Sequence, residues 1–250
     1  MGDTPSYSPD GKRIAYSSSD GHDYEIYTKS VGGGGKTQVT SNNTDDFWPS
    51  YSPDGKKIAY QGYEGNDPEV STDSEIFTIN ARGGPAFNVT NNDTFDFQPS
   101  YSPGGKKIAY VVYEGTTGDS DIYTINAGGG DAFNVTNNDR PDFFPDYSPD
   151  GEKITYSGTD VDGFESEIYT INVGGGIPFQ VTNNIKDDED PSYSPDGKKV
   201  AYTGYNGLGS DDGEDYDHEI YTINVGGGGK SQVTNTTNSF AASPSWGRRP

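Results

Sequence analysis

The chain has no cysteine among its 250 residues and only two histidines. The lack of cysteine excludes disulfide bridges, thiol catalysis and metal sites with cysteine ligands. Positive charge is scarce too, because 17 Lys and Arg stand against 39 Asp and Glu, giving a formal net charge of -22. Phosphate binding needs clustered basic side chains, so this balance disfavours nucleic acid and anionic membrane surfaces as partners. It favours cations and basic partners.

Long hydrophobic runs are also missing. Hydrophobic residues make up 29% of the chain, and none of their runs approaches the roughly 20 residues of a membrane span. No signal peptide is recognised before Gly2. Aromatic residues reach 13%, which a disordered acidic chain would lack. We therefore expect a folded chain without one large apolar core, either a mature domain or part of a longer protein.

A repeated motif organises the whole sequence. It reads PSYSPDGKKIAY from Pro49 to Tyr60, and a shortened copy, PSWGRRP, begins at Pro244. Other copies begin at Pro5, Pro99, Pro145 and Pro191. The successive spacings are 44, 50, 46, 46 and 53 residues, which match the roughly 40–50 residues of a four-stranded propeller blade.

Each repeat shows four strand signals. Residues 49–52 form a short segment before a Pro-Asp-Gly turn, and residues 57–60 are a compact apolar run of the kind that is covered on both faces. Residues 75–80 and 87–90 supply the third and the outer strand, separated by a double-glycine turn. No helix is expected. The fold class is therefore all-β, a β-propeller of four-stranded antiparallel blades.

We predict a single domain over residues 1–250 with five blades. The predicted repeats span residues 5–48, 49–98, 99–144, 145–190 and 191–243, and residues 244–247 form a closing strand. The first strand thus has six copies and the other strands five. Either five blades close the ring and one strand is redundant, or a six-bladed ring lacks part of one blade. The surplus strand could then join neighbouring chains.

The pairing of PSYSPDGKKIAY with EIYTIN, a double-glycine turn and VTNN resembles the TolB-like β-propeller repeat, a WD-like group with a Pro-Asp signature. The resemblance covers essentially the whole chain. It implies a ring closed by its C-terminal strand and an exported protein in the periplasm or outside the cell. Propeller enzymes similar to this family carry catalytic His clusters or added domains, for which His22 and His218 offer no counterpart.

Four aspartates each lie three residues before the proline that opens a repeat. They are Asp46, Asp96, Asp142 and Asp188, and Ala241 takes this position before Pro244. Propeller geometry predicts that they enter the innermost strands near one mouth of the central channel. Converging carboxylates repel one another unless a cation or proton intervenes, so they are candidate ligand-binding residues and candidate calcium ligands. Alternatively, each Asp binds backbone amides of its own turn.

Aromatic residues flank these aspartates. Trp48, Phe97 and Phe143 are candidate ligand-binding residues beside the mouth, together with Phe47 and Phe144. Two further acidic sets have simpler explanations. The Asp of the Pro-Asp-Gly turn, such as Asp54, is expected to be structural. The carboxylates that open the third strand, such as Glu25 and Glu167, are expected to pair with neighbouring Lys.

Acidic loops before that strand, such as those beginning at Asp160 and Asp211, give only a weak calcium signal, because their spacing does not match the EF-hand. No GxSxG, HExxH or phosphate-binding loop occurs. We therefore expect a non-catalytic scaffold that binds a protein, a peptide or a cation through one face. The alternatives are a structural protein that self-assembles through the surplus strand, stabilised by calcium, and, third, an enzyme.

Overall fold

The computed structural model describes residues 5–63, 73–115, 118–160, 163, 165–205, 218–235 and 241–246. The loop predicted from Asp211 to Asp215, residues 161 and 162 of the Asp160 loop and the last residue of the predicted closing strand lie outside these ranges. In the described part all regular elements are strands, as the sequence predicted. That part has no helix with the length and hydropathy that a membrane crossing requires.

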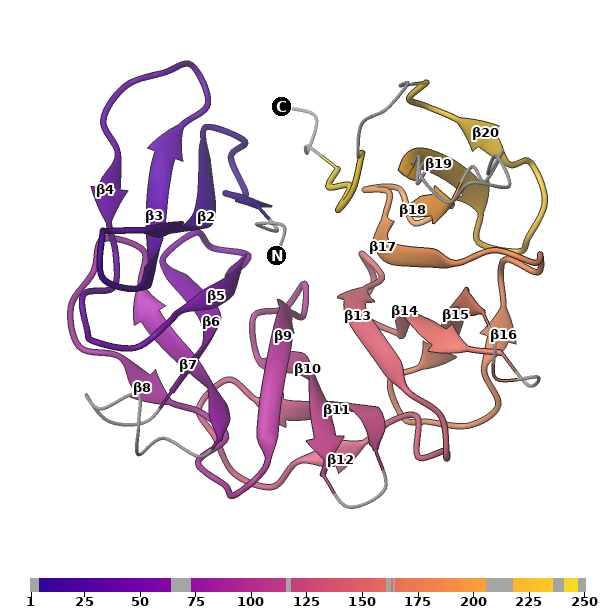
Figure 1. Ribbon diagram of the computed structural model, residues 1–250, viewed down its shortest axis with the longest axis horizontal. Coiled ribbons are helices and arrows are strands. Elements are labelled where there is room, and N and C mark those ends of the chain that lie inside the picture. Colours follow the sequence, from indigo (N-terminus) through magenta and orange to yellow (C-terminus); the bar gives the residue numbers. More distant parts are fainter. Residues whose placement is uncertain are drawn as a thin grey trace, which may run out of the picture.

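Five antiparallel sheets of four strands surround an axis and form the predicted β-propeller (Figure 1). In each blade the strands follow in chain order from the axis to the rim. The first blade contains β1 (Ser6–Tyr7), β2 (Arg13–Ser19), β3 (Tyr24–Ser30) and β4 (Thr37–Gln38). The second contains β5 (Phe47–Tyr51), β6 (Lys57–Tyr63), β7 (Ser74–Asn80) and β8 (Phe87–Asn88).

The remaining three blades repeat this plan. The third contains β9 (Phe95–Tyr101), β10 (Lys107–Glu114), β11 (Asp119–Asn126) and β12 (Phe133–Asn134). The fourth contains β13 (Asp142–Tyr147), β14 (Lys153–Thr159), β15 (Ser166–Asn172) and β16 (Phe179–Gln180). The fifth contains β17 (Asp188–Tyr193), β18 (Lys199–Tyr205), β19 (His218–Asn224) and β20 (Ser231–Gln232). The outer strands are shorter than the sequence predicted.

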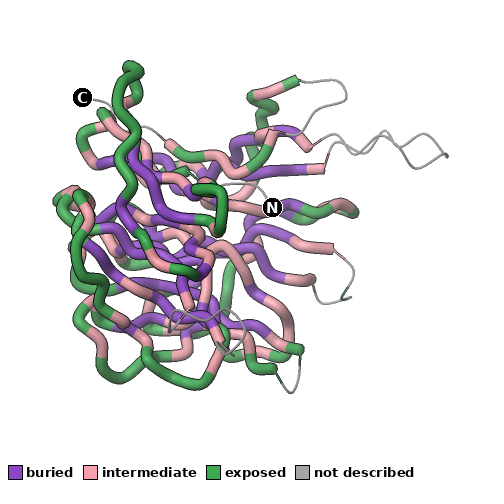
Figure 2. Tube along the Cα trace, turned by 60° about the vertical axis from the view of Figure 1, so that its left-hand side comes forward, coloured by how far each residue is buried: buried purple, intermediate pink, exposed green. Residues whose placement is uncertain are grey.

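The hydrophobic core is divided among the spaces between neighbouring blades. Along the chain, buried residues gather in the strands and exposed residues mostly in the connecting turns (Figure 2). Between the first two blades, Ile26 and Val39 pack against Tyr51, Ile58 and Tyr60. Each of the three middle blades is therefore covered on both faces, which explains why its second strand is apolar at successive positions. Thin layers of Ile, Val and Tyr also explain how a chain with little hydrophobic content folds.

The Pro-Asp-Gly turns have the structural role that the sequence predicted. In the second blade, Asp54 accepts hydrogen bonds from the Ser52 hydroxyl (2.8 Å) and the Lys56 amide (3.0 Å). Gly55 follows with a φ of 68°, a backbone conformation that glycine adopts at little cost. These hydrogen bonds hold the pKa of the Asp54 carboxyl below its usual value.

The surplus first-strand copy lies beside the fifth blade. The Ala241 amide donates to the carbonyl of His218 (3.0 Å), and the Trp246 indole N–H donates to the carbonyl of Ser192 (3.0 Å). In Figure 1 this segment runs next to β17, in the opening between the first and the fifth blade. The described chain thus comprises five complete blades and one additional segment near the axis.

Candidate functional site

The four aspartates predicted as ligands are buried, with exposed fractions between 0 and 3%. Each accepts a hydrogen bond from the side-chain amide of the Asn four residues earlier, for example from Asn138 to Asp142 at 2.7 Å. The same bond joins Asn42 to Asp46 (3.0 Å), Asn92 to Asp96 (2.7 Å) and Asn184 to Asp188 (2.8 Å). Asp142 and Asp188 also lie close to Gly158 and Gly204 of the next strand, where no side chain occupies the space.

A second buried carboxylate lies near each of these aspartates. It is Glu25, Glu75, Asp121 or Glu167, on the third strand of the preceding blade. The expectation that these carboxylates pair with Lys is corrected, because Glu25 accepts hydrogen bonds from the Thr40 hydroxyl and the Asn42 amide. The local sequence places this Thr and Asn directly after the outer strand, within reach of the third strand.

Burial raises the pKa of each aspartate, and the neighbouring carboxylate adds to the effect. The pKa rises to about 8 for Asp46 and to about 7 for Asp96, Asp142 and Asp188. The structure therefore pairs each aspartate with a carboxylate of the preceding blade. None of the four is among the residues that line the two axial cavities, so the expected convergence at the channel mouth is not what the strands produce.

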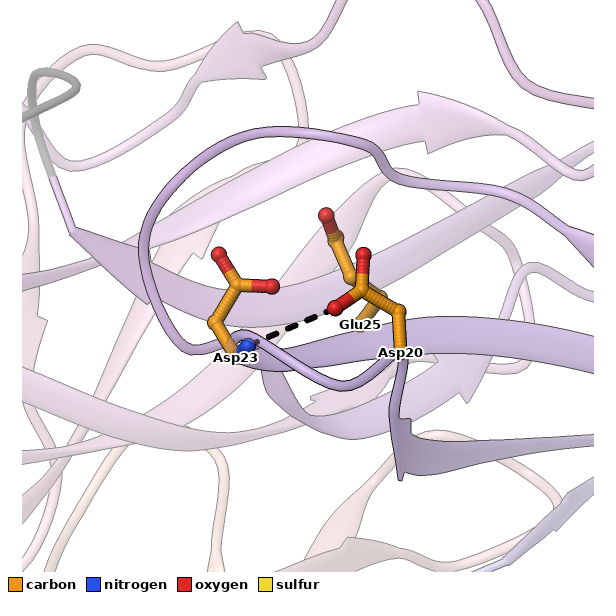
Figure 3. A group of neighbouring side chains, drawn as sticks. All are labelled: Asp20, Asp23 and Glu25. Carbon is orange, nitrogen blue, oxygen red and sulfur yellow. Dashed lines mark hydrogen bonds between the residues drawn. The ribbon is translucent and has the colours of Figure 1, made fainter.

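One acidic group in the described part has carboxylate oxygens close enough to hold a metal ion together. Asp20, Asp23 and Glu25 bring three such atoms within 4.8 Å of one another (Figure 3). Asp20 also accepts hydrogen bonds from the amides of His22 (2.9 Å) and Asp23 (3.4 Å), which is ordinary turn chemistry. Asp20 and Asp23 lie in the loop between β2 and β3, the class of loop in which the sequence suggested calcium, and Glu25 lies on β3.

A ring of polar side chains surrounds the axis on the innermost strands. It is formed by Ser6, Ser50, Ser100, Asp146, Ser192 and Ser245. In this ring Ser6 accepts the Tyr51 amide (3.1 Å), and Asp146 accepts the Tyr193 amide (2.8 Å). Asp146 is thus the single carboxylate at a position that is otherwise serine. Burial raises the pKa of Asp146 to about 6.

A second ring follows where each inner strand begins, and it varies between blades. Its members are Trp48, Gln98, Phe144, Asp190 and Ser243, and we call them the variable ring. All five directly precede the repeat proline, and their φ angles lie between 48° and 55°. This left-handed conformation is costly for residues other than glycine. In the second to the fifth blade, it coincides with a bulge in the pairing of the inner strand with the next strand.

The variable ring lines a cavity of about 170 Å³ on the axis, together with Asp146. Gln98 accepts the Phe144 amide (2.8 Å), and one carboxylate oxygen of Asp190 accepts the Ser243 hydroxyl (3.0 Å). The other oxygen of Asp190 is buried and has no hydrogen-bond partner among the residues that the structure describes. Two aromatic rings and two carboxylates therefore meet in one small space. A larger cavity of about 950 Å³ continues along the axis toward the Pro-Asp-Gly turns.

The aromatic residues predicted beside the mouth are brought together. The ring centroids of Trp48 and Phe97 are 6.2 Å apart, as are those of Phe97 and Phe143. Phe47 and Phe144 extend this row at 5.9 and 6.3 Å. We call these five residues the aromatic belt. Their role in ligand binding stays a prediction.

Sequence reasoning missed Asp146, Asp190 and Gln98. Alignment of the repeats contained a signal for them, because Asp146 interrupts a column of serines and the position before each proline differs in every copy.

A model of the PD40 family, described as the TolB β-propeller domain, matches residues 3–164. Among solved structures, a protein assigned as TolB from Agrobacterium tumefaciens is 25% identical, with a TM-score of 0.75 over 92% of this chain and 79% of that chain. TolB from Acinetobacter baumannii is 24% identical, with a TM-score of 0.71 over 90% of this chain, which spans 52% of that protein's length.

An oligogalacturonate lyase in complex with manganese has a TM-score of 0.63 at 14% identity, over 91% of this chain and 63% of that chain. At this identity the likeness concerns the fold alone. No curated protein sequence matches this chain. Because the family model covers well over half of the 250 residues, and the repeats on which it rests recur through all five blades, the chain belongs to the TolB β-propeller family.

Proposed function

We propose that this chain is a non-catalytic binding scaffold whose axial mouth, formed by the variable ring and the aromatic belt, recognises a protein or peptide partner. The variable ring carries the proposal. Five equivalent backbone positions have the same strained conformation, yet they present Trp, Gln, Phe, Asp and Ser. Strained conformations persist mainly where a site requires them, and variation within otherwise similar repeats is typical of a recognition surface.

The chemistry of the mouth indicates what the partner presents. Trp48 and its aromatic neighbours offer rigid apolar area, which contributes strongly to binding in protein interfaces. Asp146 and Asp190 offer negative charge in the same cavity, and the net charge of -22 attracts basic partners over a longer range. We infer a partner segment that places an apolar side chain on the aromatic belt and a basic group near Asp146.

A selection from a random peptide library tests this proposal. We expect enriched peptides to combine basic and aromatic or aliphatic residues, and to lose binding to the Trp48→Ala, Asp146→Asn variant. Ile177→Asp is the matched control, because Ile177 is 96% exposed. Enrichment that is the same on the double variant and on the wild type would refute a site at the mouth.

The proposal has finer parts that concern location, cation binding and assembly. Export to the periplasm or outside the cell is supported by family membership, the absence of cysteine and the acidic composition. A cation at Asp46, Asp96, Asp142 and Asp188 remains the proposal from the sequence, and Asp20, Asp23 and Glu25 are the group with matching geometry. Self-assembly is the second candidate function. The exposed Val233 of the fifth blade and Tyr7 of the first blade favour it, because they leave apolar surface that a second chain could cover.

A further inference from the structure

The four interfaces between successive blades are built alike. In the first, Ile26 and Val39 of one blade pack against Tyr51 and Ile58 of the next. The corresponding outer valines are Val39, Val89, Val135 and Val181, with exposed fractions between 2 and 5%. The corresponding inner-strand tyrosines are Tyr51, Tyr101, Tyr147 and Tyr193, with exposed fractions between 6 and 9%.

The two ends of the blade series lack this cover. Val233 of the fifth blade is 61% exposed, and Tyr7 of the first blade is 37% exposed. Ile14 and Tyr16 are half-buried, whereas their counterparts Ile58 and Tyr60 are buried. Two faces with the composition of an interior interface therefore remain open toward the gap between the first and the fifth blade (Figure 1).

Residues 241–246 already follow the path of one more inner strand. The bond from the Ala241 amide to the His218 carbonyl (3.0 Å) corresponds to the bond from the Asp46 amide to the Tyr24 carbonyl (2.7 Å). Ser243 has a φ of 55°, like the other members of the variable ring. The segment therefore continues the established interface between blades, with Trp246 at the position that Tyr holds in every complete repeat.

We propose that this gap is a docking site for three β-strands of the same repeat pattern, which pair with residues 241–246 and complete a sixth blade. The occupant is a partner polypeptide rather than a second copy of the complete first blade. The inner-strand position is already filled by residues 241–246, so an entire four-stranded blade would collide with it. Addition of strands to a free edge is an established mode of recognition.

The two open faces define the chemistry of the occupant. Toward Val233 it presents the Ile, Val and Tyr side chains of an interior interface. Toward the first blade it meets Lys29, which is exposed and replaces the buried isoleucine found at this position as Ile79, Ile125, Ile171 and Ile223. An acidic or polar residue on that side of the occupant therefore complements the first blade.

Binding of a synthetic peptide of residues 149–182, which spans β14, β15 and β16, tests the docking site. The chain has two tryptophans, so Trp48→Phe leaves Trp246 as the sole fluorescent reporter. We expect saturable one-to-one binding with a blue shift of Trp246, because the occupant covers it. Val233→Asp places a charge in the interface and is expected to weaken binding by about tenfold or more. Ile177→Asp, at a turn far exposed to solvent, leaves the affinity unchanged.

A covalent fusion tests the same docking site in case the isolated peptide does not bind because it does not fold. Residues 148–182 are joined directly to Trp246, and the melting temperature is compared with that of a fusion carrying the same residues in scrambled order. A higher melting temperature for the ordered fusion supports the docking site, since stacked repeats gain stability from each added interface. Binding that survives Val233→Asp, or an ordered fusion no more stable than the scrambled one, overturns it. Self-association of the chain that Val233→Asp abolishes would make a second copy the occupant and overturn the three-strand assignment.

Discussion

The buried aspartates make the stability of this propeller depend on pH in the direction opposite to that of a salt-bridged carboxylate. A substitution of Asp142 alone tests this pH dependence. Burial, together with the nearby Asp121, raises the pKa of Asp142 to about 7. Asp142→Asn keeps the shape of the side chain and an oxygen that accepts the Asn138 amide, but it removes the proton equilibrium.

The sign follows from proton binding. Between the unfolded pKa of 3.8 and the folded pKa of about 7, the folded chain holds a proton that the unfolded chain has released. The stabilisation is complete below the lower pKa and is lost as the pH rises through the upper one. One such group changes the free energy of unfolding by up to about 1.4 kcal/mol per pH unit within this window. Asp46, Asp96 and Asp188 share the arrangement of Asp142. Asp142→Asn should therefore remove about a quarter of the slope of unfolding free energy against pH that these four aspartates produce together.

Urea unfolding followed by circular dichroism at several pH values from about 5 to 8 measures this slope. We expect the wild type to be less stable at the upper end, and Asp142→Asn to have a shallower decline and higher stability there. Asp150→Asn is the control, because hydrogen bonds from Ser148 and the Glu152 amide lower the pKa of Asp150, which therefore exchanges its proton below this range. Wild-type stability that rises with pH, or an unchanged slope in Asp142→Asn, would refute the assignment.

The remaining predictions concern packing and metal binding. Gly158→Ala should destabilise the chain by about 1–3 kcal/mol in urea unfolding, because the new methyl group would lie 2.6 Å from an Asp142 oxygen; Gly174→Ala, with open space around it, is the control. Val135→Ala should lower the free energy of unfolding by about 1–2 kcal/mol, and Val233→Ala should hardly change it, because Val135 is 2% and Val233 61% exposed. Equal losses in the two variants would contradict the uncovered face of the fifth blade. If calcium binds the four buried aspartates, it should raise the melting temperature more at about pH 8 than at about pH 6, because metal and proton compete for the same carboxylates. A sample with a chelator is the reference. No shift at either pH would mean that these residues are structural.

The sequence determined the blades because each blade repeats a local pattern. Copies of Lys-Ile-Ala-Tyr and Glu-Ile-Tyr-Thr specify strands, and Pro-Asp-Gly specifies the turns. The spacing between copies then indicates that each repeat forms one four-stranded blade. The role of Asp54 and the proximity of Trp48 to Phe97 were also accessible, since neighbouring blades repeat the same position.

The tertiary structure decided where the polar side chains point. A residue before proline is normally extended, yet the bulge gives Trp48 and its counterparts a left-handed backbone that no local rule predicts. Asp142 is buried between the third and the fourth blade, where Asn138 donates a hydrogen bond to it and Gly158 of β14 leaves room for its carboxylate. The exposure of Val233 depends only on whether another blade follows. Register, burial and neighbours distant in sequence determine these features, and an identical repeat can therefore be core in one blade and open surface in another.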